Sequence, residues 1–312
     1  MNAAMKSTLF FLLTVLCNGL ALSQARPVFD VHFHTDTGKF LPREYIAGEL
    51  HELEPLSRDE MIRESLAVMN QLNIVHAITS GPDPAVVKKW HEVDPGRFIP
   101  ALQVPSANDD QDYLDAIREL ITDGDIAVLG EIALQYEGIG ASHAAYEAFF
   151  SIAEDLDVPV AVHLGPGPHD VFDVRPDYRA ADGDPLELEV VLHRHPGLRI
   201  YVMHAGWPFI ENMIAIMHTY KNVYVDTAFI NTALPEQELY YVLRRFVGAG
   251  LGARIMFGSD PHPGAIALSI RTAYERIDAA EFLSDEQKED IFFENASRFF
   301  RMTMEDKENA QR

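Results

Sequence analysis

The sequence has almost no cysteine. Cys17 is the only one in 312 residues, and it lies in an N-terminal segment that we expect to be removed. The mature chain would then contain no thiol, which excludes disulfides and thiolate metal ligands. Any metal ion would have to be held by His, Asp and Glu side chains.

Long apolar runs are also absent beyond the N-terminus. There, Lys6 precedes the stretch STLFFLLTVLCNGLALS, and small residues follow in SQA, an order typical of a secretory signal peptide. The alternative, a membrane anchor, needs ~20 apolar residues, whereas Asn18 interrupts this run. We predict a signal peptide over residues 1–25, cleaved near Ser23 or Ala25, and a secreted or periplasmic protein.

Basic residues are scarce. The chain has 25 Lys and Arg against 48 Asp and Glu, a formal charge of −23 that becomes −24 without Lys6. Such a surface repels phosphate backbones and anionic lipid. We therefore expect a small-molecule substrate, no nucleic-acid partner and no stable membrane insertion once the signal is removed. A homo-oligomer is compatible with this composition.

Eight apolar, β-branched runs alternate with amphipathic segments, which is the pattern of a (β/α)8 TIM barrel of the α/β class. The predicted strands are 27–34, 74–80, 97–104, 126–134, 158–165, 198–206, 223–229 and 253–260. An open doubly wound sheet is the alternative, but no G-x-G-x-x-G turn follows the first strand.

No repeat or Ser/Gly linker divides the chain, so we predict one barrel domain over residues 26–302. A helical segment at 284–301 would add a further C-terminal helix packed on the outside. The polar residues 303–312 form a tail.

Imidazoles and carboxylates gather at the predicted strand ends. His32 and His34 are two apart on the first strand, so both leave the same face. Since the C-terminal ends of parallel strands share one rim, these groups would meet there and favour a divalent metal. The other strand-end residues of this kind are Glu131, His163, His204 and Asp260.

This ordered set, together with GSDPH on the eighth strand and ENASRFF near the C-terminus, resembles the amidohydrolase superfamily. It is similar to the branch of amidohydrolase-related hydrolases and decarboxylases. The resemblance implies one or two divalent ions, with zinc preferred and iron, manganese or cobalt also suitable. The implied ligands are His32, His34, His163 and Asp260.

Two roles stay open in this resemblance. His204 is either a ligand of a second metal or a catalytic group acting on the substrate. Glu131 stands where some relatives carry a bridging carboxylated lysine. It either bridges two metals or accepts a hydrogen bond from a ligating histidine.

The resemblance is compatible with hydrolysis and with decarboxylation, and we favour hydrolysis because we predict that the protein is exported. A bound cation lowers the pKa of water to ~7 and polarises a carbonyl. Asp260 would take the proton and return it to the leaving group, while His204 would stabilise the oxyanion or position the carbonyl. The function we expect is cleavage of an amide, ester or lactone bond. The alternatives are decarboxylation of an aromatic or conjugated acid, a non-catalytic metal-binding barrel and, disfavoured by charge, a nuclease.

Several other side chains lie near the expected mouth of the barrel. We expect the loop after the fifth strand to bind a substrate carboxylate, and Trp207 to form a pocket wall. The loop residues concerned are His169, Arg175 and Tyr178.

Further histidines and acids are not expected to take part in the chemistry. We expect His76 to be a core residue and His193 and His195 to lie on the surface at a helix end. Glu154 and Asp155 should lie on a solvated helix face. His262, directly after the eighth strand, is a further candidate for the pocket lining.

Overall fold

The structure is a computed structural model that describes residues 26–35, 43–104, 106, 108–165, 167, 171–304 and 306–307. The predicted signal peptide, His169 and part of the predicted tail lie outside these residues. Within the described ranges, no helix has the length and apolar character needed to cross a membrane.

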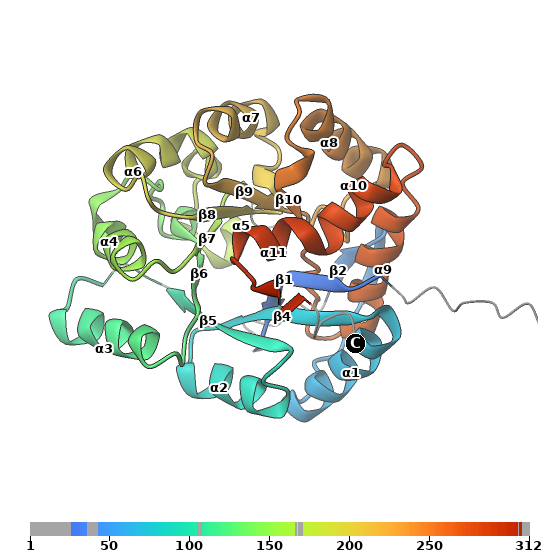
Figure 1. The fold of residues 1–312 in the computed structure, drawn as a ribbon, viewed down its shortest axis with the longest axis horizontal. Helices are drawn as coiled ribbons and strands as arrows, with labels where there is room; N and C mark the ends of the chain where they lie inside the picture. Colours follow the sequence, from blue (N-terminus) through green and yellow to red (C-terminus); the bar gives the residue numbers. More distant parts are fainter. Residues whose placement is uncertain are drawn as a thin grey trace, which may run out of the picture.

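Eight parallel strands form a nearly closed barrel, each beside the strand that precedes it in the sheet (Figure 1). The strands are β1 Val28–His34, β4 Ile74–Gly81, β5 Phe98–Val104, β6 Val128–Ile132, β7 Val160–His163, β8 Ile200–Met203, β9 Val223–Asp226 and β10 Ile255–Met256. Each lies within or closely overlaps a predicted strand, so the TIM-barrel prediction is confirmed.

The two ends of the sheet are joined by backbone hydrogen bonds between β1 and the segment after β10. Val31 N donates to Phe257 O at 2.9 Å, and Asp260 N donates to His32 O at 2.9 Å. These bonds bring the first and last strands of the barrel side by side at its mouth.

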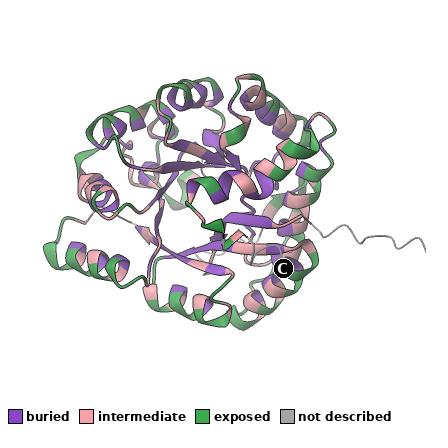
Figure 2. Cartoon of the chain, viewed as in Figure 1, coloured by how far each residue is buried: buried purple, intermediate pink, exposed green. Residues whose placement is uncertain are grey.

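Most of the helices ring the barrel, and α11 crosses one end of it (Figure 1). Their bounds are α1 Arg58–Leu72, α2 Pro84–Val93, α3 Gln111–Thr122, α4 Glu147–Asp155, α5 Val171–Val174, α6 Leu188–Arg194, α7 Ile210–Thr219, α8 Glu236–Gly248, α9 Ile266–Asp278, α10 Asp285–Glu289 and α11 Asn295–Phe299. Figure 2 shows buried residues on the strands and on the inner helix faces, with exposed residues on the outer faces.

Local sequence explains where such helices begin. The Ser57 hydroxyl accepts from Glu60 N, and the Glu60 carboxylate accepts from Ser57 N, a reciprocal cap that starts α1. Met61, Val68 and Met69 then follow at helical spacing and are buried against the sheet.

The predicted C-terminal helical segment is present, but it does not join the outer ring as expected. Phe300 stacks on Phe29 at the start of β1, and Phe299 packs against Tyr201 and Tyr224 near the starts of β8 and β9. The segment therefore covers the N-terminal end of the barrel. These rings join a buried cluster that also contains interior side chains of the barrel such as Ala101.

The connection after β1 contains an antiparallel hairpin that the sequence patterns did not predict. It comprises β2 (Arg43–Ile46) and β3 (Glu49–Glu52). Ile46 is buried, and Ala47 N donates to Thr232 O at 2.7 Å. The hairpin is thereby fixed to the rim of the barrel next to the loop after β9.

Candidate metal centre

The pair of histidines on β1 lies at the mouth of the barrel, as predicted. Their Nε2 atoms approach to 3.3 Å, and the two rings meet edge to face. His32 is fully buried, whereas about a quarter of the His34 side chain is exposed. Two imidazoles aimed at each other in this way need a shared proton or a shared cation between them.

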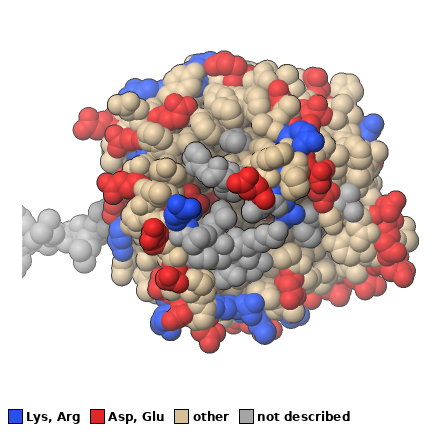
Figure 3. All heavy atoms as spheres, turned by 180° about the vertical axis from the view of Figure 1, so that it is seen from behind, with Lys and Arg blue, Asp and Glu red and all other residues tan. Residues whose placement is uncertain are grey.

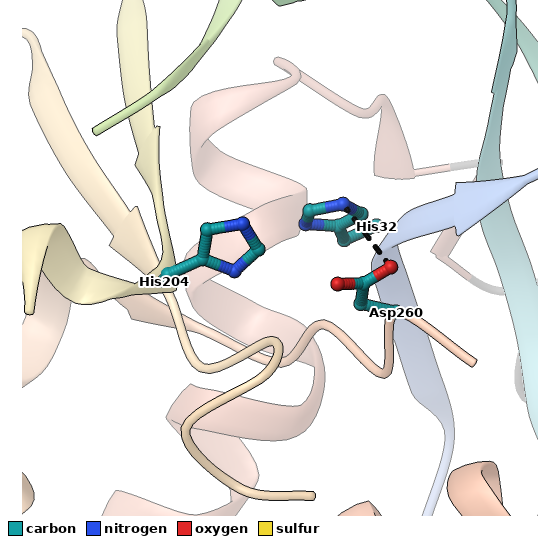
Figure 4. A group of neighbouring side chains, drawn as sticks. All are labelled: His32, His204 and Asp260. Atoms are coloured by element: carbon teal, nitrogen blue, oxygen red, sulfur yellow. Dashed lines mark ion pairs between the residues drawn. The ribbon is translucent and has the colours of Figure 1, made fainter. Parts of the chain in front are cut away.

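The four other predicted ligands meet this pair from the ends of β6, β7, β8 and β10. His34 Nε2 lies 3.4 Å from Glu131 Oε2 and 3.3 Å from Asp260 Oδ1. His204 Nε2 lies 3.3 Å from His163 Nδ1, which also contacts Glu131. Figure 4 shows His32, His204 and Asp260 converging from three elements.

These six side chains form three overlapping groups of possible metal ligands, with ligand atoms within 4.8 Å of one another in each group. The groups are His32, His204 and Asp260; His32, His34 and Glu131; and Glu131, His163 and His204. Four imidazoles and two carboxylates are a donor set that suits divalent zinc, manganese, iron or cobalt. The residues present therefore fit the metal that the sequence predicts.

Glu131 occupies a central position in this set. One of its carboxylate oxygens faces His34, and the other faces His163. It belongs to two of the three ligand groups. A carboxylate placed in this way can bind two ions or hydrogen-bond to one histidine, so both roles considered from the sequence remain available.

Hydrogen bonds on the far side of the rings orient the imidazoles. His32 Nδ1 lies 3.0 Å from Asp226 Oδ2, and His204 Nδ1 lies 3.2 Å from Ala228 O. Because both partners can only accept, each Nδ1 carries a proton, and each Nε2 faces the centre, where it can bind a cation once it is deprotonated. Gln103 and Ser80 flank Nδ1 of the remaining β1 histidine at 2.8 and 3.3 Å.

The two residues assigned to catalysis share an uncommon backbone conformation. His204 has φ 59° and Asp260 has φ 43°, a left-handed region that side chains other than glycine rarely adopt. Such conformations cost on the order of 1–3 kcal/mol and persist where surrounding contacts impose them. Here Asp226 Oδ1 accepts from His204 N at 2.7 Å, and the Asp260 amide bonds to β1.

A buried network fixes the loop that carries Asp260. Asp30 accepts hydrogen bonds from the hydroxyl and the amide of Ser259 and from the amide of His32. A Cβ atom on Gly258 would lie 2.9 Å from the Cβ of His32, so glycine allows this loop to approach β1 closely. The network ties the eighth barrel strand to the first.

Charges among these side chains balance one another. Burial disfavours charge on His32, but Asp260 and Asp226 outweigh it and raise its pKa to about 10. Burial is likewise outweighed at Asp260, where His32 and His34 hold the carboxyl pKa well below its usual range. Burial and nearby His163 lower the pKa of His204 to about 4. A divalent cation would replace protons held by the imidazoles.

A cavity of about 390 Å³ opens beside the centre. His34, Gln103 and Asp260 line its inner end, and the β2–β3 hairpin and Phe229 form part of its wall. Seen from the side opposite to Figure 1, the surface is hollowed near its middle, with many acidic side chains spread around it (Figure 3). Substrate-sized space therefore adjoins the candidate ligands.

The predicted substrate-binding residues differ in their position relative to this cavity. Arg175 and His262 line the cavity. The Tyr178 hydroxyl accepts from Gly167 N and donates to Gly165 O. Trp207 packs near Phe229 and donates to Glu238 at 2.9 Å, and it does not line this cavity. Their roles toward substrate stay predictions.

Two interpretations of polar residues were wrong. His195 is not a surface residue, because it is buried between Glu154 Oε2 at 2.9 Å and Glu147 Oε1 at 3.0 Å. Glu154 is not simply solvated, since it also accepts from Gly197 N. His76 was expected to be a core residue, and it is partly buried between Phe29 and Phe293.

The sequence reasoning missed some functional positions. It noted Asp226 near the end of the seventh strand but gave it no role, although it holds both His32 and His204. It gave Asp30 no role, although D-x-H-x-H places that residue on the same strand as the ligands. Tyr136 was also missed. Its ring lies edge-on to His163, with centroids 5.3 Å apart.

A (β/α)8 barrel with imidazole and carboxylate ligands at the C-terminal ends of its strands defines a class of metal-dependent barrel enzymes. The profile of the amidohydrolase family matches residues 29–302. The chain therefore belongs to the amidohydrolase family, which is enzymatic and metal-dependent, and the resemblance seen in its motifs is confirmed.

Comparison with curated proteins gives no match. Solved structures match over most of the chain at low identity. A probable 2-pyrone-4,6-dicarboxylic acid hydrolase from Acinetobacter baumannii with citric acid bound shares 12% identity, covering 88% of this chain and 99% of that one, with a TM-score of 0.62.

Two further solved structures are similar to the same extent. A dihydroxybenzoic acid decarboxylase from Polaromonas sp. JS666, with bound manganese and the inhibitor 2-nitroresorcinol, shares 14% identity over 91% of this chain and 99% of that one, with a TM-score of 0.58. A 4-oxalomesaconate hydratase from Rhodopseudomonas palustris shares 14% over 91% and 97%, with a TM-score of 0.58. These likenesses support the fold.

Proposed function

We propose that this protein is a metal-dependent hydrolase that cleaves an amide, ester or lactone bond of a small molecule. One observation carries the proposal. Asp260 belongs to the ligand cluster and also lines the adjoining cavity, with about a quarter of its side chain exposed. A carboxylate in that position can touch both a metal ion and a reacting molecule in the cavity.

When bound, a divalent cation supplies Lewis acidity toward a carbonyl oxygen and a water molecule of lowered pKa. His32, His34, Glu131, His163, His204 and Asp260 would hold it. We propose zinc as the ion, and manganese is the competitor to test, because the similar dihydroxybenzoic acid decarboxylase binds manganese.

Asp260 is the proton carrier in this proposal. Its pKa lies well below the usual carboxyl range, because His32 and His34 outweigh the effect of burial. It is therefore ionised at neutral pH and can accept the proton of the attacking water. It then delivers that proton to the leaving group, so no net proton is consumed.

His204 fits a ligand better than an oxyanion donor. Its Nδ1 proton is directed to Ala228 O, and its pKa of about 4, lowered by burial and His163, keeps it neutral. A neutral imidazole with that proton placement has only a lone pair at Nε2, which can bind a cation but cannot donate to an oxyanion.

The substrate end of the cavity contains Arg175, which we propose binds a carboxylate of the substrate.

We further propose that residues 1–25 are a signal peptide that directs export of the protein, and that the protein has no nucleic-acid partner. A homo-oligomer is compatible with both proposals. N-terminal sequencing of protein from the extracytoplasmic fraction tests export, and a chain that retains Met1 contradicts it.

Decarboxylation is the competing reaction, since solved structures of similar fold include a hydrolase, a decarboxylase and a hydratase. The test uses protein stripped of metal and reloaded with Zn²⁺ or Mn²⁺, screened against lactones, N-acyl amino acids and aromatic acids in H2¹⁸O. Hydrolysis predicts metal-dependent incorporation of ¹⁸O into the product. Release of CO2 without ¹⁸O incorporation contradicts the proposal, and the absence of any turnover favours a non-catalytic metal-binding barrel.

A further inference from the structure

We infer that Tyr136 contacts the substrate and, together with Arg175, binds a carboxylate remote from the bond that reacts. The inference rests on the proposed function, because it assumes that the cavity beside the metal centre receives the substrate. It goes further by naming a residue without an assigned role and by assigning the substrate to the carboxylic acids.

Tyr136 lies beside the metal centre. It follows β6 in the short helical turn Leu134–Glu137, five residues after Glu131. Its ring is edge-on to His163, with centroids 5.3 Å apart, and packs against Tyr178 at 5.4 Å. The ring therefore stands between a predicted metal ligand and the loop that follows β7.

The hydroxyl of Tyr136 points along that loop. A Cβ atom on Gly167 would lie 2.8 Å from this hydroxyl and 2.9 Å from Cγ2 of Val171. Glycine at this position therefore leaves the room that the phenol occupies. The phenol and the start of α5 are close neighbours.

The two neighbouring tyrosines differ in what their hydroxyls bind. The Tyr178 hydroxyl accepts from Gly167 N at 2.9 Å and donates to Gly165 O at 3.2 Å, so its proton serves the loop. The Tyr136 hydroxyl forms no hydrogen bond with any residue that the structure describes. Its proton is available for a ligand.

Arg175 brings a charge to the same side. The Arg175 amide donates to Val171 O at 2.8 Å, so Arg175 lies one helical turn after Val171. Val171 and the Tyr136 hydroxyl both lie beside Gly167. The Arg175 side chain lines the cavity that also reaches His34 and Asp260. Among the described residues that line this cavity, it is the only Lys or Arg.

The Tyr136 phenol follows β6 and the Arg175 guanidinium follows β7, and together they suit an anion with several acceptor oxygens. On a chain of net charge −23, a cation facing the cavity is also a local exception to the general repulsion of anions. A metal ion can itself bind one carboxylate of a ligand. This subsite should therefore be recognised by tighter binding of a dicarboxylate than of a monocarboxylate.

The experiment compares isophthalate with benzoate on the metal-loaded protein by isothermal titration calorimetry. We expect wild type to bind isophthalate more tightly. Tyr136→Phe keeps the ring and removes only the hydroxyl. It should weaken isophthalate binding about tenfold or more, the value of one hydrogen bond to a charged group, and change benzoate binding less than about twofold.

Arg175→Gln should act in the same direction on isophthalate alone. Tyr146→Phe is the matched control, because its buried phenol bonds to Glu137 outside the centre. Metal content and melting temperature should be the same in all variants. Equal binding of the two acids by wild type, or an unchanged preference in Tyr136→Phe, overturns the inference.

This readout needs no turnover, so it separates two failures. If the isophthalate preference falls in Tyr136→Phe but no bond is hydrolysed, the carboxylate subsite stands and the proposed function fails. If hydrolysis is found but the preference does not change, Tyr136 only packs against His163.

Discussion

The chain contains two H-x-H sequences, at opposite ends of the barrel, and they form different environments. His32 and His34 end β1 at the mouth, with their Nε2 atoms 3.3 Å apart. His193 and His195 end α6 before β8 begins, and only His195 is buried. There, the Nε2 atom of His195 faces Glu147 and the Nδ1 atom faces Glu154. Arg194 forms an ion pair with Glu147.

Backbone geometry explains the difference. Residues two apart leave the same face of a strand, whereas on a helix they are about 200° apart. The strand therefore aims two imidazoles at one point, and the helix separates them. At the mouth, imidazoles face imidazoles and a cation can join them. At the opposite end, one imidazole already has two acceptors and a guanidinium nearby disfavours a cation. The same motif thus predicts a metal site only on a strand.

The largest effect expected at the mouth comes from Asp260→Asn, which keeps the shape of the side chain and removes the base. General acid–base catalysis contributes ~10²–10⁴-fold, so kcat should fall by at least that range in metal-replete protein. Asp155 in α4 forms an exposed ion pair with Arg118. Asp155→Asn is therefore the matched control and should leave kcat unchanged. Full activity in metal-replete Asp260→Asn would contradict the mechanism and leave the metal as a structural element.

The next effect concerns how the imidazoles are held. Asp226→Asn replaces the carboxylate that accepts from His32 and from the backbone of His204. Loss of such a partner costs about 10–100-fold in metal affinity, measured by competition with a chelator. Glu154→Gln makes the same chemical change beside His195 and should leave metal content unchanged. If Asp226→Asn and Glu154→Gln lower metal affinity equally, the two ends of the barrel do not differ in metal binding.

Metal binding should also depend on pH. In metal-free protein the His32 pKa is raised from 6.5 to about 10, so its contribution to folding is full below pH 6.5 and is lost as pH rises through about 10. Metal binding needs the opposite, a deprotonated Nε2. Affinity should therefore rise up to about tenfold per pH unit near neutrality, with about one proton released. Calorimetry in buffers of different ionisation enthalpy measures that release, and its absence contradicts the assignment.

The smallest effects belong to the helix-end pair. His195→Ala removes two hydrogen bonds, but its glutamate partners are 29% and 38% exposed and regain water. We expect a loss of about 1 kcal/mol in the free energy of unfolding, measured by denaturant melts, with no change in metal content. His193→Ala, at an exposed position, should change stability by less than ~0.5 kcal/mol. Loss of metal in either variant would show that both H-x-H sequences serve the centre.

Much of the barrel and its centre could be predicted because both depend on short-range patterns. The eight apolar runs define strands, and parallel strands bring their C-terminal ends to one rim. His32, Glu131 and His163 could therefore be assigned to one site from their positions alone.

Other features depend on partners distant in sequence. His195 is buried by two glutamates 48 and 41 residues away, which no local pattern reveals. The position of Phe299 at the base of the barrel depends on contacts with Tyr201 and Tyr224, which lie 98 and 75 residues earlier in the sequence. Asp226 could be placed near a strand end, but the nitrogen it faces depends on the register of neighbouring strands.

The closure of the barrel has a consequence for biosynthesis. Asp30 and Ser259 are bonded although 229 residues separate them, and the same contact sets Asp260 beside His32. A growing polypeptide therefore contains all four ligand imidazoles long before it contains the Asp260 carboxylate that completes the set. We expect the ion to be acquired by the finished chain and not during translation, and a fragment that ends before Asp260 to lack both a closed barrel and a complete set of ligands.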